Sequence, residues 1–314
     1  MPTIDDPTLV FEQERVRLVR LAYRMLGSLG EAEDVVQDAW LRWRQVDHTG
    51  VASAGAFLSR TVTRLCLDVM KSARARRETY FGTWLPEPVA MDPEEAFGDD
   101  LTLTLMLALE RLSPLERAAF LLHDVFAVPL AEIATTLRRE PPAVRQLAAR
   151  ARKHVQSERL RFPIEKDEGA RIAKAFFEAS TTGDVAALRT MLADAVVVHS
   201  DGGGKVHAFP RPIVGIDKVT RMFEGVVRKA WIQHARKLQD LWIDGLPGYF
   251  SLEPGGTFQT VALDIRDGLI VGIYFTRNPD KLQRMAMLFG GAAGAPTPHG
   301  ISPAGDGEFP AADG

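Results

Sequence analysis

The spacing of hydrophobic positions divides the chain into a helical half and a mixed half. From Leu9 to Arg77, apolar residues recur every three or four positions, which predicts three amphipathic helices. The same spacing returns from Leu101 to about Arg161. Prolines, aromatic residues and acidic residues alternate between these two stretches, at residues 79–100, and this composition is typical of an extended linker.

Beyond residue 163 the pattern changes to two short helical segments, six strand-like segments and one further helix. One strand-like segment is residues 205–209, and Asp267-Gly268 predicts a hairpin turn between the last two. From residue 290 onward Gly, Ala, Pro and Ser prevail, which predicts a disordered tail. The expected fold class is therefore multidomain, with two all-α domains followed by an α+β domain.

The segment Pro129–Lys153 is predicted to be a helix-turn-helix. Pro141 and Pro142 stand at the start of its second helix, where the missing amide donor costs nothing. The periodicity turns Val144, Leu147, Ala148 and Ala151 inward. It leaves a polar and basic face that fits a major groove: Arg145, Gln146, Arg150, Arg152 and Lys153. A basic, solvent-exposed helix without a ligand is the alternative interpretation.

Two earlier helices carry opposite charge. The helix beginning at Glu31 has an acidic side and an apolar side that includes Trp40, which suits a docking surface for a basic partner. The next helix, around residues 56–77, is cationic and long enough to follow several phosphates. Each pattern alone is also compatible with an ordinary solvated helix face.

Composition narrows the function classes only a little. The net charge is −3, so DNA binding has to be argued from local clusters. Cys66 is the only cysteine, which excludes an internal disulfide and a cysteine-built zinc site and fits a reducing cytosol. There is no signal-peptide pattern and no long apolar run, so we expect a cytoplasmic protein with no membrane partner.

Three segments, residues 24–43, 57–76 and 110–153, together resemble the extracytoplasmic-function (ECF) sigma factors of bacterial RNA polymerase. The resemblance implies sigma region 2 at residues 1–78, a linker at 79–100 and sigma region 4 at 101–162. The implied partners are the β and β′ subunits of core RNA polymerase and promoter DNA. No cofactor and no catalytic activity are expected, because the polymerase performs the chemistry.

The resemblance also implies roles for individual residues. Docking on the β′ subunit falls to Asp34, Gln37, Asp38, Trp40 and Arg42. The residues expected along the −10 element are Arg60, Thr63, Arg64, Lys71 and Arg74. The loop Asp47–Ser53 would hold a base flipped out of the non-template strand. Reading of the −35 element falls to Arg145, Gln146 and Arg150, and phosphate contacts to Arg138, Arg139 and Lys153.

Residues 163–289 resemble a cone-shaped α+β fold called SnoaL-like or nuclear-transport-factor-2-like, with 290–314 as the tail. Three motifs are similar to those of an ECF subgroup with such a fused extension, the sigma factor J type among them. The motifs are WLPEP (Trp84, Leu85, Pro86, Glu87, Pro88), DGGGK (Asp201, Gly202, Gly203, Gly204, Lys205) and NPDKL (Asn278, Pro279, Asp280, Lys281, Leu282). The subgroup implies regulation in cis, partly in place of a separate anti-sigma factor.

The role of the extension is open to more than one hypothesis. In the first, Trp84–Pro86 docks near the Asp201–Lys205 loop, with Lys205 near Glu87. That loop lacks the spacing of a phosphate-binding loop, and a simple hairpin is an equally good interpretation. Alternatively, the cone is a small-molecule sensor, or an enzyme whose polar residues converge in a pocket: His199, Asp201, His207, Trp231, His234 and Asp240.

Overall fold

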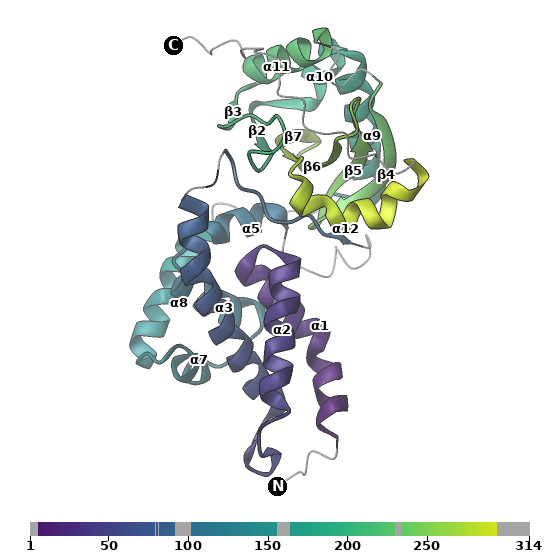
Figure 1. Ribbon diagram of the computed structural model, residues 1–314. Helices are drawn as coiled ribbons and strands as arrows, with labels where there is room; N and C mark the ends of the chain where they lie inside the picture. The colour runs from purple at the N-terminus through teal and green to yellow at the C-terminus, as the bar shows by residue number, and fades with distance from the viewer. Residues whose placement is uncertain are drawn as a thin grey trace.

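The computed structural model describes residues 6–78, 80, 82–91, 102–155, 164–229 and 234–293, excepting the side chains of 73–78, 292 and 293 (Figure 1). Helices form the first half, and a sheet with covering helices forms the second, which confirms the predicted fold class. Residues 79, 81 and 92–100 of the predicted linker and residues 294–314 of the predicted tail lie outside the described residues, as do Trp231 and the side chain of Arg74.

The first helical domain consists of α1 (Pro7–Leu26), α2 (Leu29–Trp43), the 3-10 turn η1 (His48–Gly50) and α3 (Ala54–Glu78). Asp6 begins α1 by accepting hydrogen bonds from two free amides of its first turn. Gly27 ends α1 in the left-handed conformation, with φ 71°, and Ser28 then caps α2. The reversal is therefore completed within two residues.

The second helical domain consists of α5 (Leu103–Glu110), α6 (Pro114–Phe120), the π-type turn η2 (Leu121–Val125), α7 (Leu130–Leu137) and α8 (Pro141–Val155). Ser113 and Glu116 form a reciprocal capping box at the start of α6. Helices α7 and α8 form the predicted helix-turn-helix, and its turn begins at Arg138, which is left-handed with φ 52°. The residues expected to point inward from α8 are all buried.

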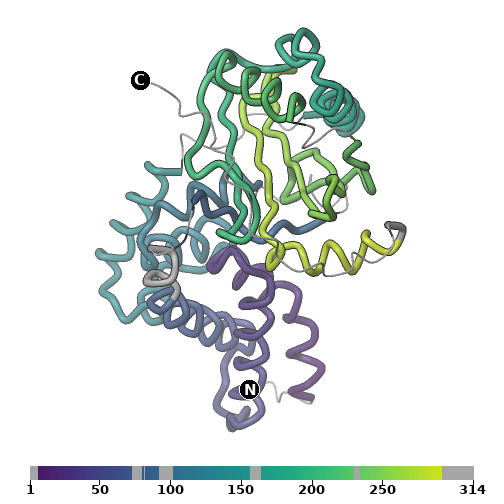
Figure 2. The backbone as a smooth tube through the Cα atoms, turned by 45° about the horizontal axis from the view of Figure 1, so that its top comes forward, coloured from purple at the N-terminus to yellow at the C-terminus, as the bar shows by residue number. Residues whose placement is uncertain are grey.

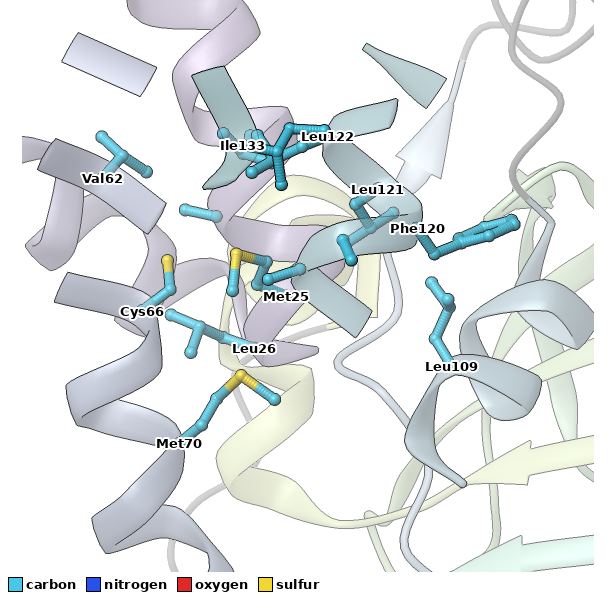
Figure 3. Packing of buried hydrophobic residues seen from close by; sticks show 14 of the residues in the cluster. Met25, Leu26, Val62, Cys66, Met70, Leu109, Phe120, Leu121, Leu122 and Ile133 are labelled. Carbon is cyan, nitrogen blue, oxygen red and sulfur yellow. The ribbon is translucent and has the colours of Figure 1, made fainter. Parts of the chain in front are cut away.

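The two helical domains share one hydrophobic core. Met25 and Leu26 of α1 and Cys66 of α3 belong to the same cluster of buried side chains as Phe120 and Ile133 of the second domain. Figure 3 shows Met25, Leu26, Cys66 and Ile133 gathered around a common interior, with Phe120 extending to the side of Leu109. Burial of this apolar surface stabilises the packing of the two domains against each other.

The sheet domain begins with α9 (Lys166–Thr182) and α10 (Val185–Met191). Its strands and later helices are β2 (Leu192–Asp201), β3 (Ile213–Val214), α11 (Ile216–Arg228), β4 (Arg236–Ile243), β5 (Leu246–Leu252), β6 (Phe258–Arg266), β7 (Leu269–Thr276), α12 (Pro279–Phe289) and the 3-10 turn η3 (Gly290–Ala293). The strand order is β1-β4-β5-β6-β7-β2-β3. Only the β2–β7 pairing is parallel among the described strands.

Strand β1 (Ala90–Met91) is supplied by the linker. Ala90 pairs with Ile243 and Met91 with Trp242, both in antiparallel register with β4. The linker therefore adds an edge strand to the sheet of the C-terminal domain, a pairing in which main-chain hydrogen bonds supply the attraction. A two-residue strand has no periodicity that a sequence pattern could reveal.

Local details of the sheet domain agree with the sequence in some places and differ in others. Asp267 and Gly268 both have positive φ, 50° and 77°, as a two-residue hairpin of the predicted kind requires. The prediction of a strand at residues 205–209 is wrong, because those residues form a turn and loop. Helix α12 was not predicted, although Asn278-Pro279 is a helix-start signal that its sequence offers.

The two faces of the sheet pack against different partners. One face and helices α9, α10 and α11 enclose a core that includes Phe176, Val198 and Ile273. Leu85 of the linker and Leu103 of α5 belong to a separate core formed with sheet residues. Figures 1 and 2 show the sheet domain stacked on one end of the helical half, with α12 at the boundary.

Candidate functional site

The three sequence motifs, far apart in the chain, meet at one junction. Asp201 is fully buried, and its carboxylate accepts hydrogen bonds from the Leu85 amide at 2.9 Å and from Lys281 Nζ at 2.7 Å. The hydroxyl of Tyr80 donates to the same carboxylate. We call the residues Trp84, Leu85, Asp201, Asn278 and Lys281 the latch.

The Trp84 indole lies between two domains. Lys281 Nζ is 4.2 Å from the centre of its ring, which is cation–π geometry. Gly27 lies against the same ring, because a Cβ at Gly27 would come within 2.5 Å of the indole. The indole therefore joins the turn between α1 and α2 to helix α12.

The glycine run of the second motif allows a close approach of backbone to side chain. Gly203 has φ 63°, and a Cβ there would overlap the amide group of Asn278. That amide donates to Tyr80 Oη at 2.9 Å. Any side chain at Gly203 would thus displace Asn278 from the latch.

The other motif residues support this junction. Pro86, Pro88 and Gly202 are buried, Gly204 is left-handed with φ 71°, and Leu282 packs in a buried cluster with Phe250. Pro279 is the first residue of α12. These residues shape the backbone on both sides of the latch.

The expected proximity of Lys205 to Glu87 is wrong. Lys205 Nζ forms an exposed ion pair with Asp280 at 2.5 Å. Glu87 instead accepts hydrogen bonds from the Leu29 amide at 2.8 Å and from Ser28 Oγ at 3.1 Å, at the start of α2. A carboxylate is favoured there, because the helix N-terminus carries partial positive charge and free amides.

A second junction, which sequence reasoning missed, is centred on Asp244. Its carboxylate is 2.8 Å from the hydroxyl of Tyr23, and the same hydroxyl is 2.8 Å from the Glu87 carbonyl. The Asp244 backbone bonds to the linker at Val89 and to α5 at Leu103. Asp244 therefore contacts both helical domains and the linker. The sequence signal that could have drawn attention to this position is the Asp244-Gly245 pair between two predicted strands, which is typical of a hairpin turn.

Burial controls the ionisation of this second junction. It raises the pKa of Asp244 to about 7, although hydrogen bonds from Tyr23 and Val89 favour the carboxylate. The nearby Glu87 carboxylate raises the Asp244 pKa further. Burial and Asp244 also raise the pKa of Tyr23, so the phenol stays protonated.

The outer face of α8 is open. The predicted base-reading and phosphate-binding residues of the helix-turn-helix are all exposed: Arg138, Arg139, Arg145, Gln146, Arg150 and Lys153. Arg150 makes an ion pair with Glu116 at 3.2 Å, and its side chain remains mostly in solvent. The loop Asp47–Ser53 is likewise largely exposed.

The predicted DNA face of α3 is partly covered. Thr63 is fully buried and donates to the Ser59 carbonyl, so it is not accessible to DNA in this conformation. Arg64 donates to the carbonyls of Thr135 and Thr136, both at 3.0 Å, in the last turn of α7. Burial, followed by the charges of Arg138 and Arg60, lowers the Arg64 pKa.

The remaining residues of the predicted α3 face differ in exposure. Arg60 is half-buried, whereas Lys71 forms an exposed ion pair with Asp68 of the same helix, at 2.8 Å. The basic helix therefore packs against the helix-turn-helix through Arg64 and leaves Lys71 in solvent.

The predicted docking face of α2 is exposed at its polar positions, Asp34, Gln37, Asp38 and Arg42. Trp40 is half-buried, with its ring centre 4.8 Å from that of Phe11. Arg284 of α12 forms an ion pair with Glu33 of α2 at 2.9 Å. The sheet domain therefore reaches one end of this face.

The polar constellation of the enzyme hypothesis is not assembled. His207 lines a cavity in the sheet domain, whereas the His199 ring stacks on Tyr274, with ring centres 5.3 Å apart. His234 and Asp240 are exposed, and neither they nor Asp201 line that cavity. The described residues thus bring together no His–Asp pair for general acid–base work there.

None of the described helices has the length and apolar character needed to cross a bilayer.

Comparison with known proteins matches both helical domains to families. Residues 10–77 match the Sigma-70 region 2 family, and residues 102–155 match the Sigma-70 region 4 family. The chain is 37% identical over 290 residues to the ECF RNA polymerase sigma factor SigJ of Mycobacterium tuberculosis, covering 86% of this chain and 91% of SigJ.

Two further comparisons extend along most of the chain. The probable ECF sigma factor SigI of Mycobacterium tuberculosis is 30% identical over 300 residues, which covers 91% of this chain and 98% of SigI. The crystal structure of Mycobacterium tuberculosis SigJ superposes with a TM-score of 0.70 at 34% identity, covering 88% of this chain and 98% of that one. The chain therefore belongs to the extracytoplasmic-function sigma factors of bacterial RNA polymerase.

Proposed function

We propose that this sigma factor rests in a closed state, stabilised by the packing of its two helical domains and by its own C-terminal domain, from which it must open to engage a promoter. The observation that carries the proposal is the packing of Arg64 on the α7 carbonyls of Thr135 and Thr136. Helix α3 is the proposed −10 reader, and α7 and α8 form the proposed −35 reader.

Promoter geometry makes this packing incompatible with simultaneous reading of both elements. The names of the −10 and −35 elements place their centres about 25 base pairs apart, which is ~85 Å along B-form DNA. Two elements joined by hydrogen bonds of 3.0 Å cannot span that distance. Promoter recognition then requires α3 and α7 to separate.

The sheet domain stabilises the closed state through the linker. The latch fixes Leu85, strand β1 fixes Ala90 and Met91, and the backbone of Asp244 fixes Leu103. The linker is thus held at several points on the way from α3 to α5. Because these contacts are intramolecular, their effective concentration is roughly millimolar, and weak contacts suffice.

The exposed acidic face of α2 is the proposed docking surface for the β′ subunit, with the β subunit as the further partner. Arg284 forms an ion pair with Glu33 at one end of this face, so core polymerase has to compete with Arg284 for this part of α2. In this proposal the C-terminal domain replaces a separate anti-sigma factor, performs no catalysis and acts where the polymerase acts, in the cytoplasm.

Dye labelling of the full chain tests the closed state. Ala52 and Ala149 are exposed, so Ala52→Cys and Ala149→Cys give labelling sites near α3 and on α8, while the native Cys66 is buried. We expect efficient energy transfer in the free protein and a loss of transfer when core polymerase binds. Unchanged transfer on binding core polymerase contradicts the proposal.

Asp201→Asn tests the role of the latch, because it removes the charge that Lys281 pairs with. Asp280→Asn is the matched control, since it breaks the nearby exposed Lys205–Asp280 pair, which lies outside the latch. We expect Asp201→Asn to lower energy transfer and to raise transcription by reconstituted holoenzyme from a promoter selected out of random DNA. If both variants behave alike, the latch has no regulatory role.

A further inference from the structure

The sheet domain contains a cavity of about 810 Å³, and none of the residues expected to contact DNA or core polymerase lines it. Its walls come from α9, α11 and strands β2, β5, β6 and β7. This volume lies within the range of small-molecule sites, roughly 300–1,000 Å³. The cavity is therefore large enough to hold a ligand of drug-like size.

Much of the wall is apolar. Phe177 of α9, Met222 and Phe223 of α11, Tyr249 of β5 and Phe275 of β7 all line the cavity. Aromatic rings and a flexible thioether favour an apolar ligand body, because they offer large contact area and adaptable packing. The wall chemistry thus selects for a hydrophobic molecule.

One part of the wall is polar but carries balanced charge. Ser251 of β5 and Gln259 of β6 are register partners, so their side chains lie on the same face of the sheet. Glu253 is buried and ion-paired with Arg277, and both line the cavity. Because the charges of Glu253 and Arg277 neutralise each other, and Lys205, which also lines the cavity, is paired with Asp280, this end suits hydroxyl or carbonyl oxygens of a neutral molecule rather than an ion.

The cavity wall includes the linker itself. Gly82, two residues before Trp84, lines the cavity together with the loop that follows Asp201. The Arg277 amide donates to the Asp201 carbonyl at 2.8 Å, and the Arg277 guanidinium donates to the His207 carbonyl. A molecule that touches Arg277 contacts a residue hydrogen-bonded to Asp201 of the latch. A molecule that touches Gly82 contacts the chain segment that leads directly into Trp84 of the latch.

We propose that this cavity binds a neutral, largely apolar small molecule with hydroxyl or carbonyl groups at one end, and that the bound molecule favours the latched linker. The first half stands on the cavity alone, and the second rests on the proposed closed state. A ligand shifts an equilibrium toward the state that it binds better, and Gly82 lines the cavity in the latched structure, so release of the linker would remove that part of the wall.

Titration of the full chain with N-phenyl-1-naphthylamine, a neutral fluorescent apolar probe, tests the site. We expect saturable enhancement of its fluorescence. Thr181→Trp and Val226→Trp fill the cavity from α9 and α11, and each should weaken probe binding roughly tenfold or more. Thr182→Trp is the matched control, because Thr182 is the exposed neighbour of Thr181 on the same helix.

The outcomes separate the two halves of the proposal. Absence of saturable binding, or equal binding by the Thr181→Trp and Thr182→Trp variants, overturns the site. For the second half, the probe is added at a core polymerase concentration that opens only part of the protein. If the probe binds but energy transfer between the dyes at positions 52 and 149 does not change, the coupling to the linker is overturned. The proposed closed state is tested separately, without the probe. If core polymerase alone does not change energy transfer between the dyes, the closed state itself is contradicted.

Discussion

The hydroxyl of Tyr23 on α1 lies 2.8 Å from a carboxylate oxygen of Asp244, which stands in the turn between β4 and β5. The same hydroxyl lies 2.8 Å from the Glu87 carbonyl. A phenol carries one hydrogen, so it can donate to only one of these two oxygens. The second contact becomes a hydrogen bond when Asp244 is protonated and donates to the phenol oxygen.

Tyr23→Phe should loosen the contact between the first helical domain and the sheet domain. The substitution leaves a buried carboxyl and a buried carbonyl without their shared partner, which costs about 1–3 kcal/mol. We expect lower energy transfer between dyes at positions 52 and 149, because the linker loses a point of attachment. Tyr249→Phe is the control: it removes a buried hydroxyl within the sheet domain, and it should leave the dye separation unchanged. Equal transfer in Tyr23→Phe and the unsubstituted chain would contradict this role.

The closed state should weaken as the pH rises toward and through neutrality. Burial raises the pKa of Asp244 to about 7 in the closed state, whereas an exposed aspartate has a pKa near ~3.9. Closing therefore takes up a proton, and the resulting stability is full below about pH 4 and is lost as the pH rises to about 7. The groups facing Asp244 are Tyr23 from α1 and Glu87 from the linker, and the Glu87 charge acts in the same direction.

Energy transfer measured from about pH 5 to about pH 8 checks this sign. We expect transfer to decrease across the range in the unsubstituted chain. Asp244→Asn cannot titrate, so its transfer should be flat in the same window, apart from any change common to both proteins. A decrease of equal size in Asp244→Asn would assign the pH dependence to other groups.

Local patterns predicted local structure, and of the interdomain contacts only the docking of Trp84–Pro86 near the Asp201–Lys205 loop was expected from the sequence. The inward set of α8 and the Asp267-Gly268 hairpin follow from periodicity and turn chemistry that act over a few residues. The three motifs located the latch, but the partner of Glu87 was predicted incorrectly, because helix capping at Leu29 depends on how α2 meets the linker. Likewise, no pattern within α3 reveals that Arg64 binds the last turn of α7.

Arg64→Ala should affect both the closed state and DNA binding, in opposite directions. In the closed state it removes two hydrogen bonds to carbonyls of α7, so the dyes at positions 52 and 149 should separate more readily. In the open state it removes one cation from the proposed −10 face, so the slope of log K against log salt should fall in magnitude by about 1.

Lys71→Ala is the matched variant for this test. Lys71 is exposed on the same helix and pairs with Asp68 of α3 itself, so the substitution should change the salt slope and leave the dye separation as it is. DNA binding measured at several salt concentrations, together with energy transfer in the free protein, distinguishes the two variants. If Arg64→Ala leaves transfer at the level of Lys71→Ala, the Arg64 contact does not hold α3 against α7, and closure depends on the shared apolar core and the latch.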